Sequence, residues 1–261
     1  MNGASEIRLI HFSLVYLLLI VVLLVMKRCK INRTRLLFWA SLRMTVQLVL
    51  AGTILTYILK NPHWSFVLLY LGSMIAFAVH RVISVNPGLN RRFRFFILLS
   101  IAISALPLIG FFVTGVIGEN FFNAQYTIPL SGMIIGNAMT GVTLGVKTFR
   151  ESLAAQKPRI NALLNLGVTP RKILLPFVNQ SLQTAILPTM NSMLGMGIVA
   201  LPGMMTGQIL SGTLPTTAVL YQIAICIAIC AVVCLSVFSS LYFGYRTLYN
   251  SRNQIEFCTH S

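Results

Sequence analysis

Seven apolar stretches, each about as long as a membrane-spanning helix, divide the chain. They lie at roughly 9–26, 36–59, 64–80, 95–117, 127–146, 174–199 and 217–243. The hydrocarbon core of a bilayer is about 30 Å thick, so a helix needs about 20 apolar residues to cross it. Of the 261 residues, 56% are hydrophobic and 9% are charged, whereas about a quarter are charged in soluble domains. The sequence therefore predicts an all-α integral membrane protein with about seven transmembrane helices, in a single transmembrane domain over 1–261.

The basic residues predict how these helices are oriented. The links 27–35, 81–94 and 147–172 hold 5, 4 and 6 Lys and Arg residues, and the tail after position 243 holds 2. If every apolar stretch crosses the membrane, these segments share one side, and the other side holds only Arg8 and Lys60. Basic residues gather on the cytoplasmic side, so we expect the N-terminus outside and the C-terminus in the cytoplasm. The net charge of +16 then reflects topology and contact with anionic headgroups rather than a nucleic-acid partner.

Acidic residues are scarce, and this scarcity excludes several classes of protein. The chain has no Asp and four Glu, which are Glu6, Glu119, Glu151 and Glu256. None is expected near the middle of the membrane, where proton- and sodium-driven carriers use carboxylates. The inventory also argues against a two-carboxylate hydrolase and an HExxH zinc site. We expect a transport protein that is not an enzyme and takes any energy it needs from another subunit.

One segment has some features of a nucleotide-binding loop, GVTLGVKT at 141–148. A P-loop requires GxxxxGK followed by Ser or Thr, between a strand and a helix. Here the second glycine comes one position early and the segment closes an apolar stretch. The glycine pairs Gly132/Gly136 and Gly141/Gly145 are better explained as contact points between helices. We therefore expect this chain to bind no ATP itself.

The polar stretch 147–173 predicts a short amphipathic helix in the cytoplasm. This helix should end at Gly167, a favourable residue just after a helix, and the next helix should begin with Thr169 as N-cap and Pro170 at its first position. The apolar residues beside this turn, which would form a knob for a partner, are Leu163, Leu164 and Leu166. ABC permeases use such a coupling helix to contact their ATPase subunit. The alternative is an amphipathic segment that lies on the membrane surface.

Residues 200–216 combine apolar side chains with two prolines and three glycines. Non-helical backbone at membrane depth is tolerated only where protein buries it or where it lines a cavity. We interpret this segment as a broken helix end and an outer re-entrant turn beside a translocation path. Its candidate path residues are Gly203, Met204, Met205 and Gln208. The alternative is an ordinary outer loop with a few apolar side chains.

Polar side chains inside the other apolar stretches are further candidates for the path. Arg43 and Gln47 share one helix face at i and i+4, although Arg43 could instead extend to the inner helix end. Amides in a membrane need hydrogen-bond partners, and this group contains Asn137, Gln183 and Asn191.

Two sulfur-containing stripes are best explained by packing. Soft metals bind thiolates and thioethers, but Cys and Met also fill apolar cores. The stripes are Cys226, Cys230 and Cys234 at every fourth residue, and Met190, Met193 and Met196 at every third. We assign no metal site from the sequence.

Three motifs carry a family resemblance: PLSGMIIGNAM at 129–139, NLGVTP at 165–170 and LPGMMTGQILSG at 201–212. With them the chain resembles the iron-export ABC permease family, which includes the plant aluminium-sensitivity permeases, over nearly its whole length. Relatives often carry an acid where this chain has Asn191, which argues against a carboxylate-based metal site there.

The resemblance implies a permease subunit of an ABC transporter that exports metal ions such as iron or confers metal resistance. A separate ABC ATPase would bind ATP and Mg²⁺, and the permease would form a homodimer in the bacterial inner (plasma) membrane. The ATPase would contact the coupling segment at 147–173, with the candidate residues Glu151, Leu163, Leu164, Leu166, Gly167, Thr169 and Pro170. The alternative is a permease or channel-like protein that moves a small solute without an ATPase.

Overall fold

The computed structural model describes residues 9–30 and 34–250, and these residues form helices and connecting turns without a β-strand. The long helices are α1 (Leu9–Arg28), α2 (Thr34–Lys60), α3 (Trp64–Val85), α4 (Arg91–Gly110), α5 (Ala124–Ala155), α7 (Pro170–Gly195) and α9 (Pro215–Gly244). The short ones are α6 (Lys157–Asn165), α8 (Gly203–Leu210), the π-helical turn η1 (Phe111–Ile117) and the 3₁₀ turn η2 (Tyr245–Leu248). The predicted all-α class is confirmed.

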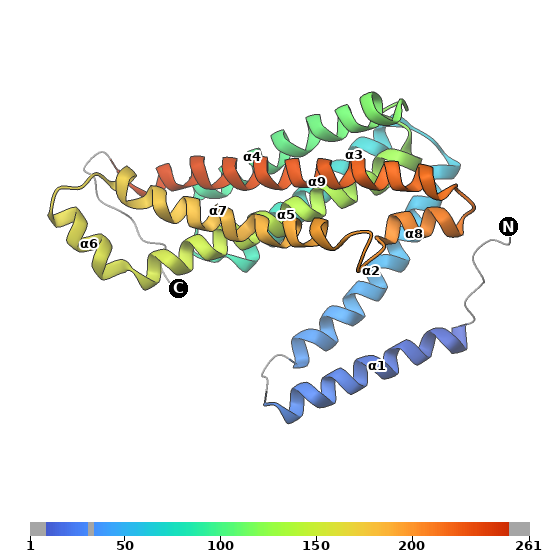
Figure 1. The fold of residues 1–261 in the computed structure, drawn as a ribbon, viewed down its shortest axis with the longest axis horizontal. Coiled ribbons are helices and arrows are strands. Elements are labelled where there is room, and N and C mark those ends of the chain that lie inside the picture. Colours follow the sequence, from blue (N-terminus) through green and yellow to red (C-terminus); the bar gives the residue numbers. More distant parts are fainter. Residues whose placement is uncertain (1–8, 31–33, 251–261) are drawn as a thin grey trace.

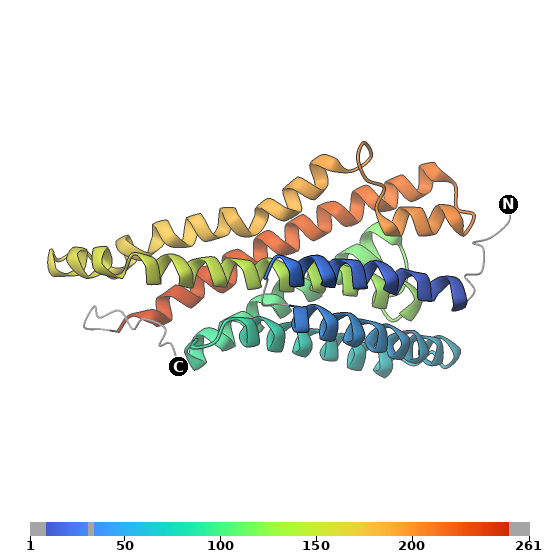
Figure 2. The ribbon, with the colours of Figure 1, turned by 90° about the horizontal axis from the view of Figure 1, so that it is seen from below.

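Most of the long helices run roughly along the long axis of the molecule (Figures 1 and 2), whereas α2 is oblique to it in Figure 1. α9 packs against α4, α5 and α7, and α5 also packs against α3. α6 lies at one end of this bundle and α8 at the other, while α1 and α2 lie to one side of it in Figure 1. α6 and α8 are therefore separated by the length of the bundle.

Within residues 9–30 and 34–250, five helical segments are long and apolar enough to cross a membrane. They are Thr34–Lys60, Trp64–Val85, Arg91–Ile117, Ala124–Ala155 and Pro215–Leu248. The remaining two predicted spans correspond to α1 and α7, which are helices of 20 and 26 residues outside that set of five. α7 carries several amides among its apolar residues, and these amides lower its hydropathy.

The predicted glycine contacts are confirmed for Gly141 and Gly145, whereas Gly132 has one looser contact, with α3, and Gly136 has none within the described residues. A Cβ atom on Gly141 would lie 2.8 Å from Val233 Cγ1 on α9, and one on Gly145 would lie 2.9 Å from Val237 Cγ1. A Cβ atom on Gly136 would meet nothing within 4 Å, and one on Gly132 would meet only Met74 Cε, at 3.4 Å. The close approach of α5 to α9 thus depends on Gly141 and Gly145.

Two predicted boundaries differ from the structure. α5 does not stop at 146 but continues to Ala155, because Lys, Arg and Glu are good helix formers and end an apolar stretch without ending a helix. Residues 200–216, predicted to form a broken helix end and a re-entrant turn, contain the short helix α8 at Gly203–Leu210. The irregular backbone lies just before α8, at Met196–Pro202, and just after it, where Gly212 has a φ of +99°.

Candidate functional site

The predicted cytoplasmic helix is α6, and the hydrogen bonds at its end require Gly167. The N–H of Gly167 donates to the carbonyl of Leu164 (2.9 Å), and the N–H of Val168 donates to the carbonyl of Leu163 (3.0 Å). This pair of bonds is a Schellman motif, and Gly167 takes the positive φ of 79° that the motif needs. The predicted helix end at Gly167 is confirmed.

The three leucines near this turn do not form one knob. Leu163 and Leu164 are half-buried and pack against the hydrophobic core. Leu166 stands at the C-cap, beyond the last residue of α6, and is 79% exposed. Of the three, Leu166 is therefore the side chain that a partner could bury.

The start of α7 agrees with the predicted boundary. Thr169 occupies the N-cap with extended backbone, and Pro170 occupies the first helical position and is buried. The Thr169 side chain makes no capping hydrogen bond. Because φ of proline is fixed near its helical value, Pro170 sets the direction in which α7 leaves the turn.

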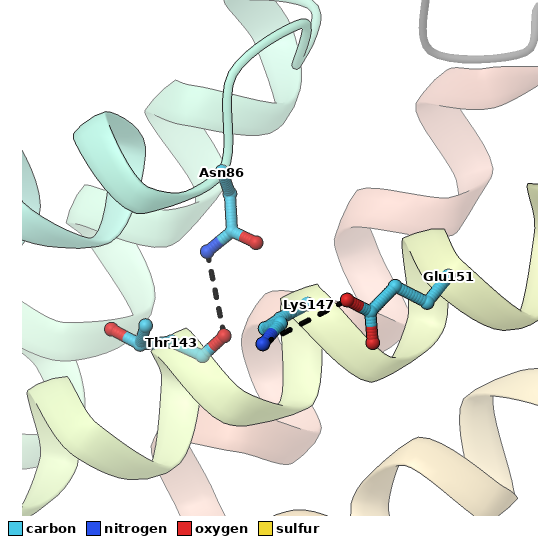
Figure 3. Close-up of polar contacts among 4 residues, drawn as sticks. All are labelled: Asn86, Thr143, Lys147 and Glu151. Carbon is cyan, nitrogen blue, oxygen red and sulfur yellow. Dashed lines mark hydrogen bonds and ion pairs between the residues drawn. The ribbon is translucent and has the colours of Figure 1, made fainter. Parts of the chain in front are cut away.

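The C-terminal half of α5 is held by a buried amide (Figure 3). Asn86, at the C-cap of α3, is fully buried, and its Nδ2 donates to Val82 O (3.0 Å) and, across to α5, to Thr143 O (3.4 Å). One turn further along α5, Lys147 and Glu151 form an exposed i, i+4 ion pair of 3.8 Å. Exposed pairs of this kind contribute little to stability, so Glu151 remains available to a partner.

A cavity of about 240 Å³ lies between α5, α7 and α9. Its lining side chains include one group of neutral polar residues and one group of sulfur-containing residues. The polar group is Asn137, Thr140, Thr189, Ser192 and Gln222, and the sulfur group is Met133, Met193, Met196 and Cys226. A second cavity of about 590 Å³ shares Met193, Met196, Pro202, Gln222 and Cys226 with it. Within the part of the chain that the structure describes, neither lining contains a charged side chain.

Three side chains meet on the wall that the two cavities share. Gln222 and Cys226 are one turn apart on α9, and Gln222 Nε2 donates to Cys226 Sγ (3.0 Å). Cys226 Sγ in turn donates to Met196 Sδ (3.2 Å). Met196 reaches this position because α7 ends there: it is the C-cap, with extended backbone, and Gly197 follows with a φ of +83°.

Gln222 was not among the residues selected from the sequence. It is 7% exposed, and its Oε1 has no hydrogen-bond partner among the described residues. The signal that could have identified it is an amide inside the strongly apolar α9, four residues before a cysteine. The three cysteines of the stripe have different surroundings. Cys226 lines both cavities, whereas Cys230 and Cys234 line neither.

The path candidates on α8 have different surroundings. Met205 lines the larger cavity, and Met204 packs against the core. Gly203 is exposed, and a Cβ atom there would meet nothing within 4 Å, so no close backbone approach requires this glycine. Gln208 lines neither cavity, although its Oε1 is covered and has no hydrogen-bond partner in the described part of the chain.

Among the other path candidates, only Asn137 lies at the cavity. Its Nδ2 donates to Met133 O (2.8 Å) on the same helix. Arg43 and Gln47 are exposed on α2, which contributes no residue to either cavity, and the Arg43 guanidinium lies over the Phe77 ring at 5.7 Å. Gln183 and Asn191 are exposed on α7 and line neither cavity.

No group of three or more His, Cys, Asp or Glu side chains that could hold a metal ion occurs within residues 9–30 and 34–250. The cavity lining offers other donor groups, namely the thiol of Cys226 and the thioethers, hydroxyls and amides of its Met, Thr, Ser, Asn and Gln residues.

Comparison with known proteins places the chain in a family. The family described as Uncharacterised protein family (UPF0014) matches residues 9–249. The chain belongs to this family. It is 31% identical to the "Probable iron export permease protein FetB" of Escherichia coli, over 93% of each chain. It is also 31% identical to the "UPF0014 membrane protein YjkA" of Bacillus subtilis, over 83% of this chain and 85% of that one.

A plant relative matches over a shorter region. The Arabidopsis thaliana "Protein ALUMINUM SENSITIVE 3" is 31% identical over 52% of this chain and 50% of its own. No solved structure matches the chain. The apolar helices and the bacterial relatives make this UPF0014 member an integral membrane protein of the inner membrane, in a family of membrane permeases.

Proposed function

We propose that the chain is the permease subunit of an ABC transporter that exports metal ions, and that a separate ATPase drives it through α6. One observation carries this proposal: α6 is a short, glycine-terminated helix at one end of the bundle, with Leu166 exposed at its tip (Figure 1). An exposed leucine beside a rigid turn can insert into an apolar groove on a partner protein. Glu151 and the α6–α7 turn would complete the contact.

The proposed topology has seven spans, with the N-terminus outside and the C-terminus in the cytoplasm. The end of α1, the start of α4 and α6 all carry basic residues. In Figures 1 and 2, the end of α1 and the start of α4 are the left-hand ends of those helices, and α6 lies at the left-hand end of the bundle. This grouping supports the cytoplasmic placement of α6.

ATP and Mg²⁺ would bind to the partner and not to this chain, which we propose is not an enzyme. The segment 141–148 is a continuous part of α5, whereas a P-loop needs a loop whose backbone surrounds the phosphates. Gly141 and Gly145 lie against α9, which leaves no room for a nucleotide beside them.

The proposed assembly is a homodimer in which α5 and α7 of the two copies face each other. α7 exposes a set of amides, namely Asn179, Gln180, Gln183 and Asn191, and α5 exposes Asn137 and Thr140 beside it. Amides facing lipid would lack hydrogen-bond partners. A second copy would supply partners and would enclose a polar path between the two α7 helices.

The substrate class rests on the name of the Escherichia coli relative, a probable iron export permease. Purification in mild detergent from native membranes tests the proposal, and we expect an ABC ATPase to co-purify at about one per permease. Leu166→Asp should abolish this association. Asn165→Asp, which adds the same charge one residue earlier, should preserve it.

Transport is the second part of the test. Proteoliposomes with both subunits should move Fe²⁺ only when ATP is supplied on the α6 side. Flux without any co-purifying ATPase would instead identify an ATPase-independent permease.

A further inference from the structure

We infer that Cys226, Met196 and Gln222 form a binding site for a soft, monovalent metal cation, of the class that includes Cu⁺ and Ag⁺. This inference goes beyond the proposed function: it assigns a site for a cation other than Fe²⁺, and binding at this site is tested separately from the ATP-dependent export of Fe²⁺. It rests on the three side chains that meet on the wall shared by the two cavities.

Two sulfur atoms already lie close together, beside the Gln222 amide. Cys226 Sγ lies 3.2 Å from Met196 Sδ and 3.0 Å from Gln222 Nε2. Thiolate and thioether ligands select soft cations such as Cu⁺. Two more thioethers, from Met133 and Met193, line the same cavity and can complete a coordination shell.

Gln222 provides the second, independent indication. An amide that is 93% buried normally satisfies its carbonyl oxygen, yet Gln222 Oε1 has no partner among the described residues. Gln222 lines both cavities, so this oxygen is available to a bound ion. Its Nε2 donates to Cys226 Sγ, so the amide lies next to the sulfur that would bind the ion.

The charge of the site selects a monovalent ion. Among the described residues, neither cavity lining holds a charged side chain, and Cys226 is the one residue of those linings that can become an anion. When the cation binds, the thiol proton leaves to solvent and the sulfur–cation bond replaces the S–H bond. A monovalent cation then gives a neutral complex, whereas a divalent cation would leave a net positive charge in an apolar environment, which is costly.

The sulfur atoms of Cys226 and Met196 must move apart when the ion binds between them. The proton of Cys226 now lies between two sulfurs 3.2 Å apart, and a metal in its place needs a wider separation. Met196 can supply it, because methionine has three rotatable side-chain bonds and this residue stands at the end of α7, next to Gly197 with its positive φ.

The test measures cation binding to the purified permease in detergent, without any ATPase. In a variant that keeps Cys226 and replaces the other four cysteines by Ser, we expect one Ag⁺ or Cu⁺ per chain in competition with a chelator. Cys226→Ser in this background should abolish binding. Met196→Leu and Gln222→Leu should each weaken it about tenfold or more, while Met44→Leu, on α2, should leave it unchanged.

Two results would overturn the inference. One is Ag⁺ binding that depends on Cys226 but is unaffected by Met196→Leu and Gln222→Leu, because that would be the affinity of an isolated thiol. The other is a higher affinity of the same site for Fe²⁺ than for Cu⁺. Gel filtration of each variant confirms the fold. Since no ATPase is present, a failure of ATPase co-purification and a failure of cation binding are separate outcomes.

Discussion

Gly145 on α5 and Val237 on α9 are so close that a Cβ atom on the glycine would lie 2.9 Å from Val237 Cγ1. Ala185 on α7 lies on the same side, with its Cβ at 3.3 Å. Three helices therefore meet at a residue without a side chain. We expect Gly145→Ala to destabilise the protein by about 1–3 kcal/mol, the typical cost of overpacking a core, as measured by thermal unfolding in detergent.

Gly136, on the same helix, provides the control for this variant. Gly136→Ala should be nearly neutral, because its Cβ atom meets nothing within 4 Å. Val237→Ala should restore much of the stability that Gly145→Ala loses. If Gly136→Ala and Gly145→Ala were equally harmful, the close contact with α9 would not be the cause.

Gly167→Val tests the turn after α6. The positive φ of 79° at this position costs a non-glycine residue about 1–2 kcal/mol, and a β-branched one more. We expect weaker association with the ATPase while the protein still inserts in the membrane. Gly167→Asn should retain association, because Asn tolerates this conformation. Equal co-purification of Gly167→Val and wild type would mean that the turn does not position the contact.

A reporter fused after Ser261 tests the proposed orientation. We expect it to be active in the cytoplasm, because seventeen of the 20 basic residues then fall on the inner side or its helix ends. A second reporter inserted after Gly118, between η1 and α5, should be extracytoplasmic. Cytoplasmic signals at both positions would rule out the seven-span arrangement.

Cross-linking tests the proposed dimer. In a cysteine-free background, Gln183→Cys on the amide face of α7 should form a disulfide-linked dimer on mild oxidation. Phe95→Cys on α4 is a matched control, since Phe95 is also exposed but lies on a helix outside the proposed interface. A dimer formed through Phe95 and not through Gln183 would put the interface elsewhere.

The helices were largely predictable from the sequence, because hydrophobic length and membrane thickness are directly linked. The predicted stretch at 36–59 became Thr34–Lys60, and the one at 217–243 became Pro215–Gly244. The turn at Gly167 was also predictable, because the positive φ that follows a helix strongly favours glycine. Where hydropathy and helix formation diverge, as in the charged end of α5, the predicted boundary was wrong.

The candidate cavity was less predictable, because it depends on which helix faces meet. Asn137 and Met205 were selected for their chemistry and do line a cavity. Arg43 and Gln47 have equally suggestive chemistry, but α2 packs too far from α7 and α9 to bring them there. Gln222 became notable only once α9 packed against the end of α7, since burial without a hydrogen-bond partner is a property of the tertiary structure.

The length of α5 has a mechanical consequence. At about 1.5 Å per residue, its 32 residues span about 48 Å, so one rigid rod extends from the cavity to the start of α6. Its middle is held on one side by α9, through Gly141 and Gly145, and on another by Asn86, through Thr143. A rigid helix that is held at its middle can pivot about that point. A partner that displaced α6 in one direction would therefore move the Met133 end of α5 in the opposite direction, together with the wall of the cavity.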